Sequence, residues 1–150
     1  WQPDALSRAA YRRRLRQTIL EWHNDSGYGF FIFRRDDEAL LGGVTLSNVR
    51  RGVAQTASLG YWIGQPYARQ GLMTEAAHAM VDHAFAEHQI PLLISCFHDD
   101  NPVSGKILSR TGFERVGACS HFSRARGCEV PVTNMRFSRQ RWLQTKNAGL

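Results

Sequence analysis

The chain has 150 residues, of which 43% are hydrophobic and 21% charged, and its formal net charge at pH 7 is +6. This length suits one domain with a sizeable core, and the composition is that of a globular rather than a disordered protein. No apolar run approaches the roughly 20 residues that span a bilayer, and the opening Trp1-Gln2-Pro3-Asp4 is unlike a secretory signal. We therefore expect a single globular domain over residues 1–150 with no membrane partner.

The cysteines and histidines indicate a reducing setting and no bound metal. Cys96, Cys119 and Cys128 form an odd set without a Cys-x-x-Cys pair, which favours a cytoplasmic protein over a disulfide framework. Cys96 lies in an apolar run and is expected in the core. Together with His98 and His121, these cysteines do not have metal-ligand spacing.

The positive charge attracts anions such as nucleic acid or a phosphorylated co-substrate. Most of it is dispersed, but five arginines cluster near the start of the chain: Arg8, Arg12, Arg13, Arg14 and Arg16. A solvated helix face is the favoured interpretation of this cluster, and a weak contact with RNA or the ribosome stays open.

The first predicted elements are a helix at 4–22 and three strands. The helix has one apolar face, formed by Tyr11, Leu15, Ile19 and Trp22. The wholly apolar 30–33 run predicts a short strand buried on both sides. A second strand is expected at 39–47, with a bulge at Gly42-Gly43. Residues 48–56 then connect to a third strand at 57–63.

A strand, a glycine-containing loop and a helix follow one another over residues 58–87. The strand ends at Ile63, and the loop runs from Gly64 to Gly71. Apolar residues then recur with helical spacing, at Met73, Ala76, Ala77, Met80, Val81, Ala84 and Phe85. This spacing predicts a helix with one buried face.

The second half of the chain predicts a buried strand at 92–97 and a short helix that begins at Asn101-Pro102 and ends before Gly112. The helix buries Val103, Ile107 and Leu108. Two last strands, joined by a turn at Gly127, are predicted at 113–122 and 130–138. Hairpins followed by helical crossovers give an α+β fold, a mixed sheet with helices on its faces.

Gly71 precedes the central helix, whose first turn has unpaired backbone N–H groups and partial positive charge. A glycine at this point admits a phosphate close to the backbone. Neither Gly-x-Gly-x-x-Gly nor the P-loop pattern is present, and a lone glycine commonly does no more than start a helix.

The residues around Gly71 resemble the acetyl-CoA pyrophosphate loop of the GNAT superfamily of N-acetyltransferases, Gln/Arg-x-x-Gly-x-Gly/Ala. Gly71 matches its central glycine, whereas Ala68 and Met73 depart from it. Segments 41–55 and 59–64 resemble the RimJ-type branch, the ribosomal-protein alanine N-acetyltransferases. With 101–113 included, the resemblance covers most of residues 30–137.

This resemblance implies a GNAT-like, mostly antiparallel twisted sheet with helices on both faces, and acetyl-CoA as co-substrate. The family's first strand is not readable here, so we expect some N-terminal residues of the domain to be missing. The residues implied to bind acetyl-CoA are Tyr61, Trp62, Ile63, Gly64, Arg69, Gln70, Gly71, Leu72, Met73, Thr74, Asn101 and Ser104. For Tyr61 and Trp62, ordinary core packing is the alternative.

Asn101 and Ser104, followed by Gly112-Phe113, match the family's second element. The resemblance implies that Asn101 contacts the cofactor arm and that Ser104 donates a proton to the leaving thiolate. The alternative is that Asn101 caps the helix and Ser104 lies in its first turn.

The general base is open between His121, Glu129 and His98. Related enzymes place a carboxylate near the position of Ser123, and this chain has none there. Histidine has a suitable unperturbed pKa, but His121 on a strand can equally be a simple exposed residue. The acceptor half of the chain departs from the RimJ branch at 122–123 and 129–132. We expect an opening between residues 44–51 and 122–130 to admit an extended peptide N-terminus.

The function implied by the resemblance is acetyl transfer from acetyl-CoA to a protein N-terminal α-amine, with a ribosomal protein as the expected partner. An acetyltransferase of a small-molecule amine is the alternative within this class. A non-catalytic acyl-CoA-binding or ribosome-binding module is the alternative from another class. Turnover with mixed acceptors distinguishes the enzymes from the module.

Overall fold

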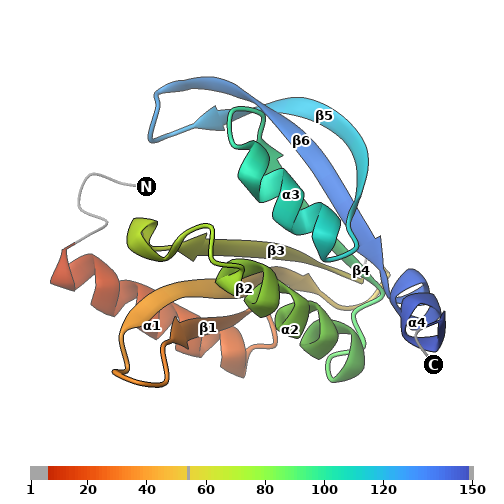
Figure 1. Ribbon diagram of the computed structural model, residues 1–150, viewed down its shortest axis with the longest axis horizontal. Helices are drawn as coiled ribbons and strands as arrows, with labels where there is room; N and C mark the ends of the chain where they lie inside the picture. The colour runs from red at the N-terminus through yellow and green to blue at the C-terminus, as the bar shows by residue number, and fades with distance from the viewer. Residues whose placement is uncertain (1–6, 54, 149–150) are drawn as a thin grey trace.

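The computed structural model describes residues 7–53 and 55–148, which form a six-stranded sheet with helices packed against it (Figure 1). The strand order is β1-β2-β3-β4-β6-β5, and β3 and β4 are the parallel neighbours in an otherwise antiparallel sheet. The strands are β1 Tyr28–Phe33, β2 Leu40–Arg50, β3 Thr56–Ile63, β4 Leu92–His98, β5 Glu114–Ser123 and β6 Cys128–Ser138. The helical elements are α1 Arg8–His23, η1 Gln65–Tyr67, α2 Leu72–Ala86, α3 Pro102–Arg110 and α4 Arg139–Ala148. The predicted mixed, mostly antiparallel sheet is therefore confirmed.

Helices cover both faces of the sheet, as predicted. Successive strand residues point to opposite faces. On β1, the Phe30 ring contacts His83 of α2 and Trp22 near the end of α1, whereas the neighbouring Gly29 and Phe31 lie against Thr18 and Tyr11 within α1. Helices α1 and α2 consequently lie on opposite faces, and α3 lies on the same face as α2 (Figure 1).

The core lies between α2 and the sheet. The buried side of α2 is formed by Met73, Ala77, Met80, Val81, Ala84 and Phe85, as its spacing predicted. These side chains pack against fully buried residues of β2 and β4, among them Leu46 and Leu93. Burying each large apolar side chain contributes about 1.5–3 kcal/mol, so this layer holds α2 firmly on the sheet.

Strand β1 is not buried on both sides, so that prediction is wrong. Phe30 and Phe31 are each 37% exposed and Phe33 is 57% exposed. In the described part of the chain β1 is an edge strand that pairs with β2 alone. An edge strand lacks a neighbour on one side, so a wholly apolar run does not ensure burial.

Two further burial predictions fail, one on β4, whose second face is not covered by a helix in the described chain, and one on α3. Cys96 is exposed rather than in the core, and Ile94 on the same face of β4 is 41% exposed. On α3, Leu108 is fully buried but Val103 is 47% exposed. A continuous apolar run in the sequence therefore does not show whether both faces of the strand are covered by helices.

The element boundaries differ from the sequence prediction in a few places. Helix α1 begins after Ser7, whose hydroxyl accepts from the Ala10 N–H, and the predicted residues 4–6 lie outside the described residues. The bulge expected at Gly42-Gly43 falls one residue earlier, because the register skips Leu41 between Ile32 and Phe33. Helix α4 was not predicted, since it has few apolar residues and no strong amphipathic pattern.

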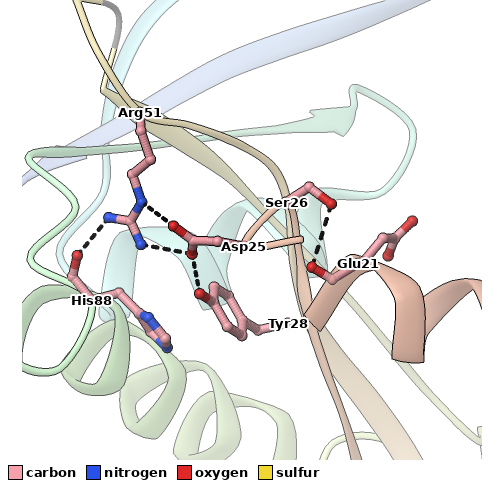
Figure 2. Close-up of polar contacts among 6 residues, drawn as sticks. All are labelled: Glu21, Asp25, Ser26, Tyr28, Arg51 and His88. Carbon is pink, nitrogen blue, oxygen red and sulfur yellow. Dashed lines mark hydrogen bonds and ion pairs between the residues drawn. The ribbon is translucent and has the colours of Figure 1, made fainter. Parts of the chain in front are cut away.

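A polar network joins the end of α1 to the far end of α2 (Figure 2). The Arg51 guanidinium donates to Asp25 from Nε at 2.7 Å and from Nη2 at 2.8 Å, and to the His88 carbonyl from Nη1 at 2.7 Å. The Tyr28 hydroxyl also donates to Asp25, and the His88 ring stacks on Tyr28. Hydrogen bonds from Arg51 and then Tyr28 lower the pKa of Asp25 to about 2.

Among the residues that the structure describes, no helix combines the length and apolar character needed to cross a membrane.

Candidate functional site

The candidate site is a fork between the parallel strands β3 and β4. Their ladder runs from Thr56 and Leu92 to Ser58 and Ile94 and then stops, although β3 continues to Ile63. Where the ladder stops, the Ser95 hydroxyl donates to the Leu59 carbonyl at 2.8 Å. Beyond this bridge, the edge of β3 that faces β4 has backbone groups without ladder partners in the described chain. These groups are available to a ligand that lies in the fork.

The loop after β3 delivers the chain to the N-terminus of α2. Gly71 is the N-cap of α2 with φ +82°, and a Cβ built on it meets nothing within 4 Å. Its left-handed conformation, rather than crowding, is what requires glycine here. The first N–H groups of α2 lack intrahelical partners, and the open space beside the Gly71 α-carbon gives room for an anion there.

The loop itself is held by its own side chains. Gln70 Nε2 donates to the Pro66 carbonyl at 3.1 Å, and Arg69 has a positive φ of 63°. Both side chains are exposed, whereas Met73 is buried and the side chains of Leu72 and Thr74 are partly buried. Backbone N–H groups, together with the Arg69 charge, are therefore what this loop offers to an anion.

Helix α3 lies on the other side of the fork. Its N-cap is Asn101, whose side chain accepts a long hydrogen bond from the Ser104 N–H at 3.4 Å. The capping role that the sequence left open is thus present, and it leaves the amide N–H₂ group of Asn101 available for another contact.

Tyr61 bridges the fork from β3 to α3. Its hydroxyl lies 3.0 Å from the Ser104 carbonyl oxygen and 3.0 Å from Ser104 Oγ. Burial raises the pKa of Tyr61, so this hydroxyl keeps its proton at neutral pH. Sequence reasoning named both residues but missed their contact, since nothing local links positions 43 residues apart.

The other predicted residues of β3 take different roles. Trp62 points to the opposite face from Tyr61 and is 37% exposed. Its indole covers Gly43, where an added Cβ would lie 2.7 Å from the ring nitrogen. The Gly64 N–H donates to the Leu41 carbonyl at 2.8 Å. Trp62 and Gly64 therefore shape the outer side of the fork.

The candidate bases do not meet one another. His121 pairs with Val130 and Glu129 pairs with Phe122, so these two side chains leave the β5–β6 hairpin on opposite faces. Both are exposed, and the His121 ring lies 3.5 Å from Cys119 Sγ. Neither has a hydrogen bond to Tyr61 or Ser104 in the described chain.

His98 ends β4, the strand that forms one wall of the fork, and its Nδ1 atom is buried without a hydrogen-bond partner in the described residues. A buried ring nitrogen without a partner is unusual in a folded protein. His98 follows Phe97, which lies against Gly105 of α3, so the His98 side chain points to the opposite face of β4 from Ser104.

Only one end of the expected acceptor opening between residues 44–51 and 122–130 lies at the fork, where Val44 pairs with Tyr61. Because β2 runs antiparallel to β3, Arg50 pairs with Thr56 at the end of the sheet far from the fork. Arg51 bonds to the His88 carbonyl, beyond the C-terminus of α2. The β5–β6 turn lies instead at the His98 end of β4, because Val132 pairs with His98.

No group of three or more potential metal-binding side chains is found among the residues 7–53 and 55–148.

Residues 1–114 match the family model of the acetyltransferase (GNAT) domain. The chain is 33% identical over 106 residues to YjcK of Bacillus subtilis (strain 168), named a probable N-acetyltransferase, covering 71% of this chain and 59% of YjcK. It is 35% identical over 100 residues to the ribosomal protein uS5 alanine N-acetyltransferase of Escherichia coli (strain K12). This match covers 66% of this chain and 52% of that enzyme. The matched region thus spans between half and three-fifths of these relatives' lengths.

Solved structures share the fold at low sequence identity. The ribosomal-protein-S5-alanine acetyltransferase of Vibrio fischeri superposes with a TM-score of 0.87 at 18% identity, covering 95% of this chain and 78% of the other. RimJ of Mycobacterium smegmatis, solved in complex with CoA-disulfide, superposes with a TM-score of 0.82 at 20% sequence identity. The match covers 89% of this chain and 63% of RimJ. A spermidine N-acetyltransferase SpeG variant of Vibrio cholerae superposes with a TM-score of 0.78 at 15% sequence identity. The match covers 91% of this chain and 79% of SpeG.

Proposed function

Because the chain belongs to the GNAT acetyltransferase domain family, we propose that it transfers the acetyl group of acetyl-CoA to an amine. The observation that carries the proposal is the fork between β3 and β4, with the open N-terminus of α2 below it. A fork with free backbone groups suits a long, thin arm with amide groups, and the helix N-terminus suits its phosphates.

Acetyl-CoA is the proposed co-substrate, and the residues around the fork fit it. The Gly71 loop, with Arg69, Gln70 and the first residues of α2, would hold the pyrophosphate. The β3 edge from Tyr61 to Ile63 would bind the pantetheine arm, since both backbone groups of Gly64 already have partners. Asn101 would use its free amide N–H₂ group on the same arm.

The chemistry requires a proton for the leaving thiolate and a neutral amine for the attack. Ser104 is proposed as the proton donor, and the Tyr61 hydroxyl, 3.0 Å from Ser104 Oγ, would orient and support it. His121 and Glu129 remain the proposed residues for the amine side of the reaction, as base and as carboxylate contact. An α-amine with a pKa near 7.7–8.0 is already about one-tenth neutral at pH 7, so a strong base is not required.

A protein N-terminal α-amine, of the kind found on ribosomal proteins, is the proposed acceptor. The support is the relative that acts on ribosomal protein uS5, at 35% identity over 100 residues. The net charge of +6 also disfavours a polycationic acceptor, which this surface would repel. The three free cysteines, Cys96, Cys119 and Cys128, suit a reducing, cytoplasmic setting.

A small-molecule amine is the second candidate acceptor. The observation in its favour is the shared fold with the SpeG spermidine acetyltransferase, at a TM-score of 0.78. A non-catalytic acyl-CoA-binding module is the candidate from another class, and turnover separates it from both enzymes.

The test offers the protein acetyl-CoA with three acceptors and follows release of CoA together with the mass of each product. The acceptors are a lysine-free peptide with a free N-terminal alanine, the same peptide with a blocked N-terminus and one internal lysine, and spermidine. We expect acetylation of the first peptide alone. Acetylation of the lysine or of spermidine, with the α-amine untouched, would overturn the proposed acceptor. Binding of acetyl-CoA without turnover of any acceptor would favour the non-catalytic module.

A further inference from the structure

The side of helix α3 that faces away from the fork lines a separate pocket. The pocket has a volume of about 470 Å³ and lies between α3 and the β4–β6–β5 part of the sheet. It is lined by Phe97, Pro102, Gly105, Lys106, Ser109, Arg110, Arg115, Thr133 and Met135. We call this the α3 pocket.

The α3 pocket and the fork lie on different sides of one helix. Successive helix residues are rotated by about 100°, so Ser109 and Lys106 point roughly 140° and 160° away from Ser104. Ser104 contacts Tyr61 in the fork, whereas Ser109 and Lys106 line the pocket. Gly105 lies against the Phe97 ring, where an added Cβ would come within 2.6 Å, so the helix closes the space between the two sites.

The floor of the α3 pocket is largely apolar, with Thr133 as its polar side chain. The ring of Phe97 on β4 and the side chain of Met135 on β6 point to the face that α3 covers. Methionine adapts its shape readily, and its sulfur packs well on aromatic rings. This floor suits a planar or compact hydrocarbon group.

The rim of the α3 pocket is positively charged. Lys106 and Arg110 lie one turn apart on α3, and Arg115 approaches from β5, at the edge of the sheet. No aspartate or glutamate lines the pocket. The nearby carboxylate of Asp99 accepts from the Thr133 hydroxyl at 2.8 Å. The ion pairs found within residues 7–53 and 55–148 are formed by other cations.

We propose that the α3 pocket binds a small amphipathic organic anion, an aromatic or branched hydrocarbon that carries one acidic group. The hydrocarbon packs on Phe97 and Met135, and Arg110 and Arg115 bind the acid from opposite sides of the opening, with Lys106 beside them. Pockets of a few hundred cubic ångströms with an apolar floor and a few convergent polar groups are typical sites for such ligands. Arginine is also the side chain best suited to a planar acid group.

The test uses naphthalene-2-sulfonate as the probe and the uncharged naphthalene-2-sulfonamide as its matched analogue, in calorimetric titrations with the whole chain. We expect saturable binding of the sulfonate and about tenfold weaker binding of the sulfonamide. Arg110→Ala and Arg115→Ala should each weaken sulfonate binding about fivefold, the effect of one half-exposed ion pair. Arg50→Ala, at an exposed arginine outside the pocket, serves as the control and should bind like the wild type.

Two further measurements address the pocket itself. Ser109→Trp adds a large side chain at an exposed pocket position without removing a charge, and it should abolish binding while the thermal unfolding midpoint stays near that of the wild type. Saturating CoA should leave the sulfonate affinity unchanged, because the two ligands use opposite sides of α3. Equal binding of the uncharged analogue, equal loss in Arg50→Ala, unimpaired binding in Ser109→Trp, or competition by CoA would each overturn the proposal.

Discussion

At Gly71 a positive φ of 82° coincides with open space beside the α-carbon. A glycine packed against a neighbour is required by sterics, whereas this one is required by its backbone conformation alone. The open space is what a phosphate would fill, so a charge placed here should affect binding more than folding.

Gly71→Asp and Gly71→Asn separate charge from shape at this position. Both side chains tolerate the left-handed conformation and are similar in size, so both variants should fold with a modest loss of about 1 kcal/mol. Saturating acetyl-CoA should raise the melting temperature of the wild type clearly and of Gly71→Asn partly. Gly71→Asp should show no rise, because its carboxylate repels the pyrophosphate. Equal rises in all three proteins would show that the loop does not bind phosphate.

The hydroxyls of Ser104 and Tyr61 form a pair, and their variants should behave as a unit. Ser104→Ala should lower kcat about tenfold or more with little change in the KM for acetyl-CoA, because a proton donor acts in the transition state. Tyr61→Phe should lower kcat in the same direction, and the double variant should lose little more than Ser104→Ala alone. Additive losses would indicate that the two hydroxyls act separately.

Asn101 should give the opposite kinetic signature. Asn101→Ala should raise the KM for acetyl-CoA several-fold with kcat largely preserved, since its proposed role is binding. Asn101→Asp is the control, because aspartate keeps the helix cap but lacks the amide N–H₂ donor. If Asn101→Asp binds acetyl-CoA normally while Asn101→Ala does not, capping alone explains the residue.

At the scale of elements, the network around Arg51 joins three parts of the fold (Figure 2). It links the loop after α1, the start of β1 and the turn after α2, through Asp25, Tyr28 and the His88 carbonyl. The His83 and His88 Nε2 atoms also lie 3.1 Å apart, so one imidazole donates to the other. Because this end of α2 is opposite Gly71, the network affects stability without touching the fork.

Acid should loosen this junction in a definite pH range. The pKa of Asp25 is lowered to about 2 from 3.8, so its stabilisation is present above about pH 4 and is lost as the pH falls towards 2. The full shift corresponds to about 2.5 kcal/mol, and with a side chain 45% exposed we expect about 1 kcal/mol. Urea unfolding at pH 7, 4 and 3 should show a steeper acid loss in the wild type than in Asp25→Asn. Identical pH profiles would contradict this assignment.

His88 should add a second, milder step at higher pH. Burial, the neighbouring His83 and Arg51 lower its pKa, whereas Asp25 and Glu87 raise it to a smaller extent. A histidine with a depressed pKa favours the folded state in its neutral form, so stability should begin to fall as the pH drops below about 6.5. In His88→Gln, the midpoint of urea unfolding should change less between pH 7 and pH 5 than it does in the wild type. An unchanged slope there would assign the step to another group.

At the scale of the whole molecule, the surface is strongly basic, with a net charge of +6. Arg8, Arg12 and Arg16 follow one another at four-residue spacing on α1, so they form one exposed stripe. We expect weak retention on immobilised RNA at about 50 mM salt that is lost near 200 mM. Replacing these three arginines by serine should reduce retention and leave acetyl-CoA binding unchanged. As control, serine at Arg35, Arg50 and Arg124 removes the same charge from dispersed positions, and an equal loss there would rule out a specific stripe.

Local signals in the sequence were sufficient for several elements. Helical spacing predicted the buried face of α2, and Gly71 predicted its start. Asn101-Pro102 and Gly112 marked the two ends of α3, because capping and a positive φ of 101° at Gly112 are local requirements. The resemblance to acetyltransferases rested on these same short segments, and the family match confirmed it.

Side-chain burial and contacts between distant segments could not be predicted from such local signals. Whether Phe31 or Cys96 is covered depends on which strand lies at an edge and which face lacks a helix. The Tyr61–Ser104 contact depends on the β3–β4 ladder stopping after Ser58. Of the stretch expected to form the acceptor opening, antiparallel β2 leaves Val44 beside Tyr61 but carries Arg50 away from the fork. Patterns of a few residues encode propensity and periodicity, whereas strand order and ladder length arise from packing between segments far apart in the chain.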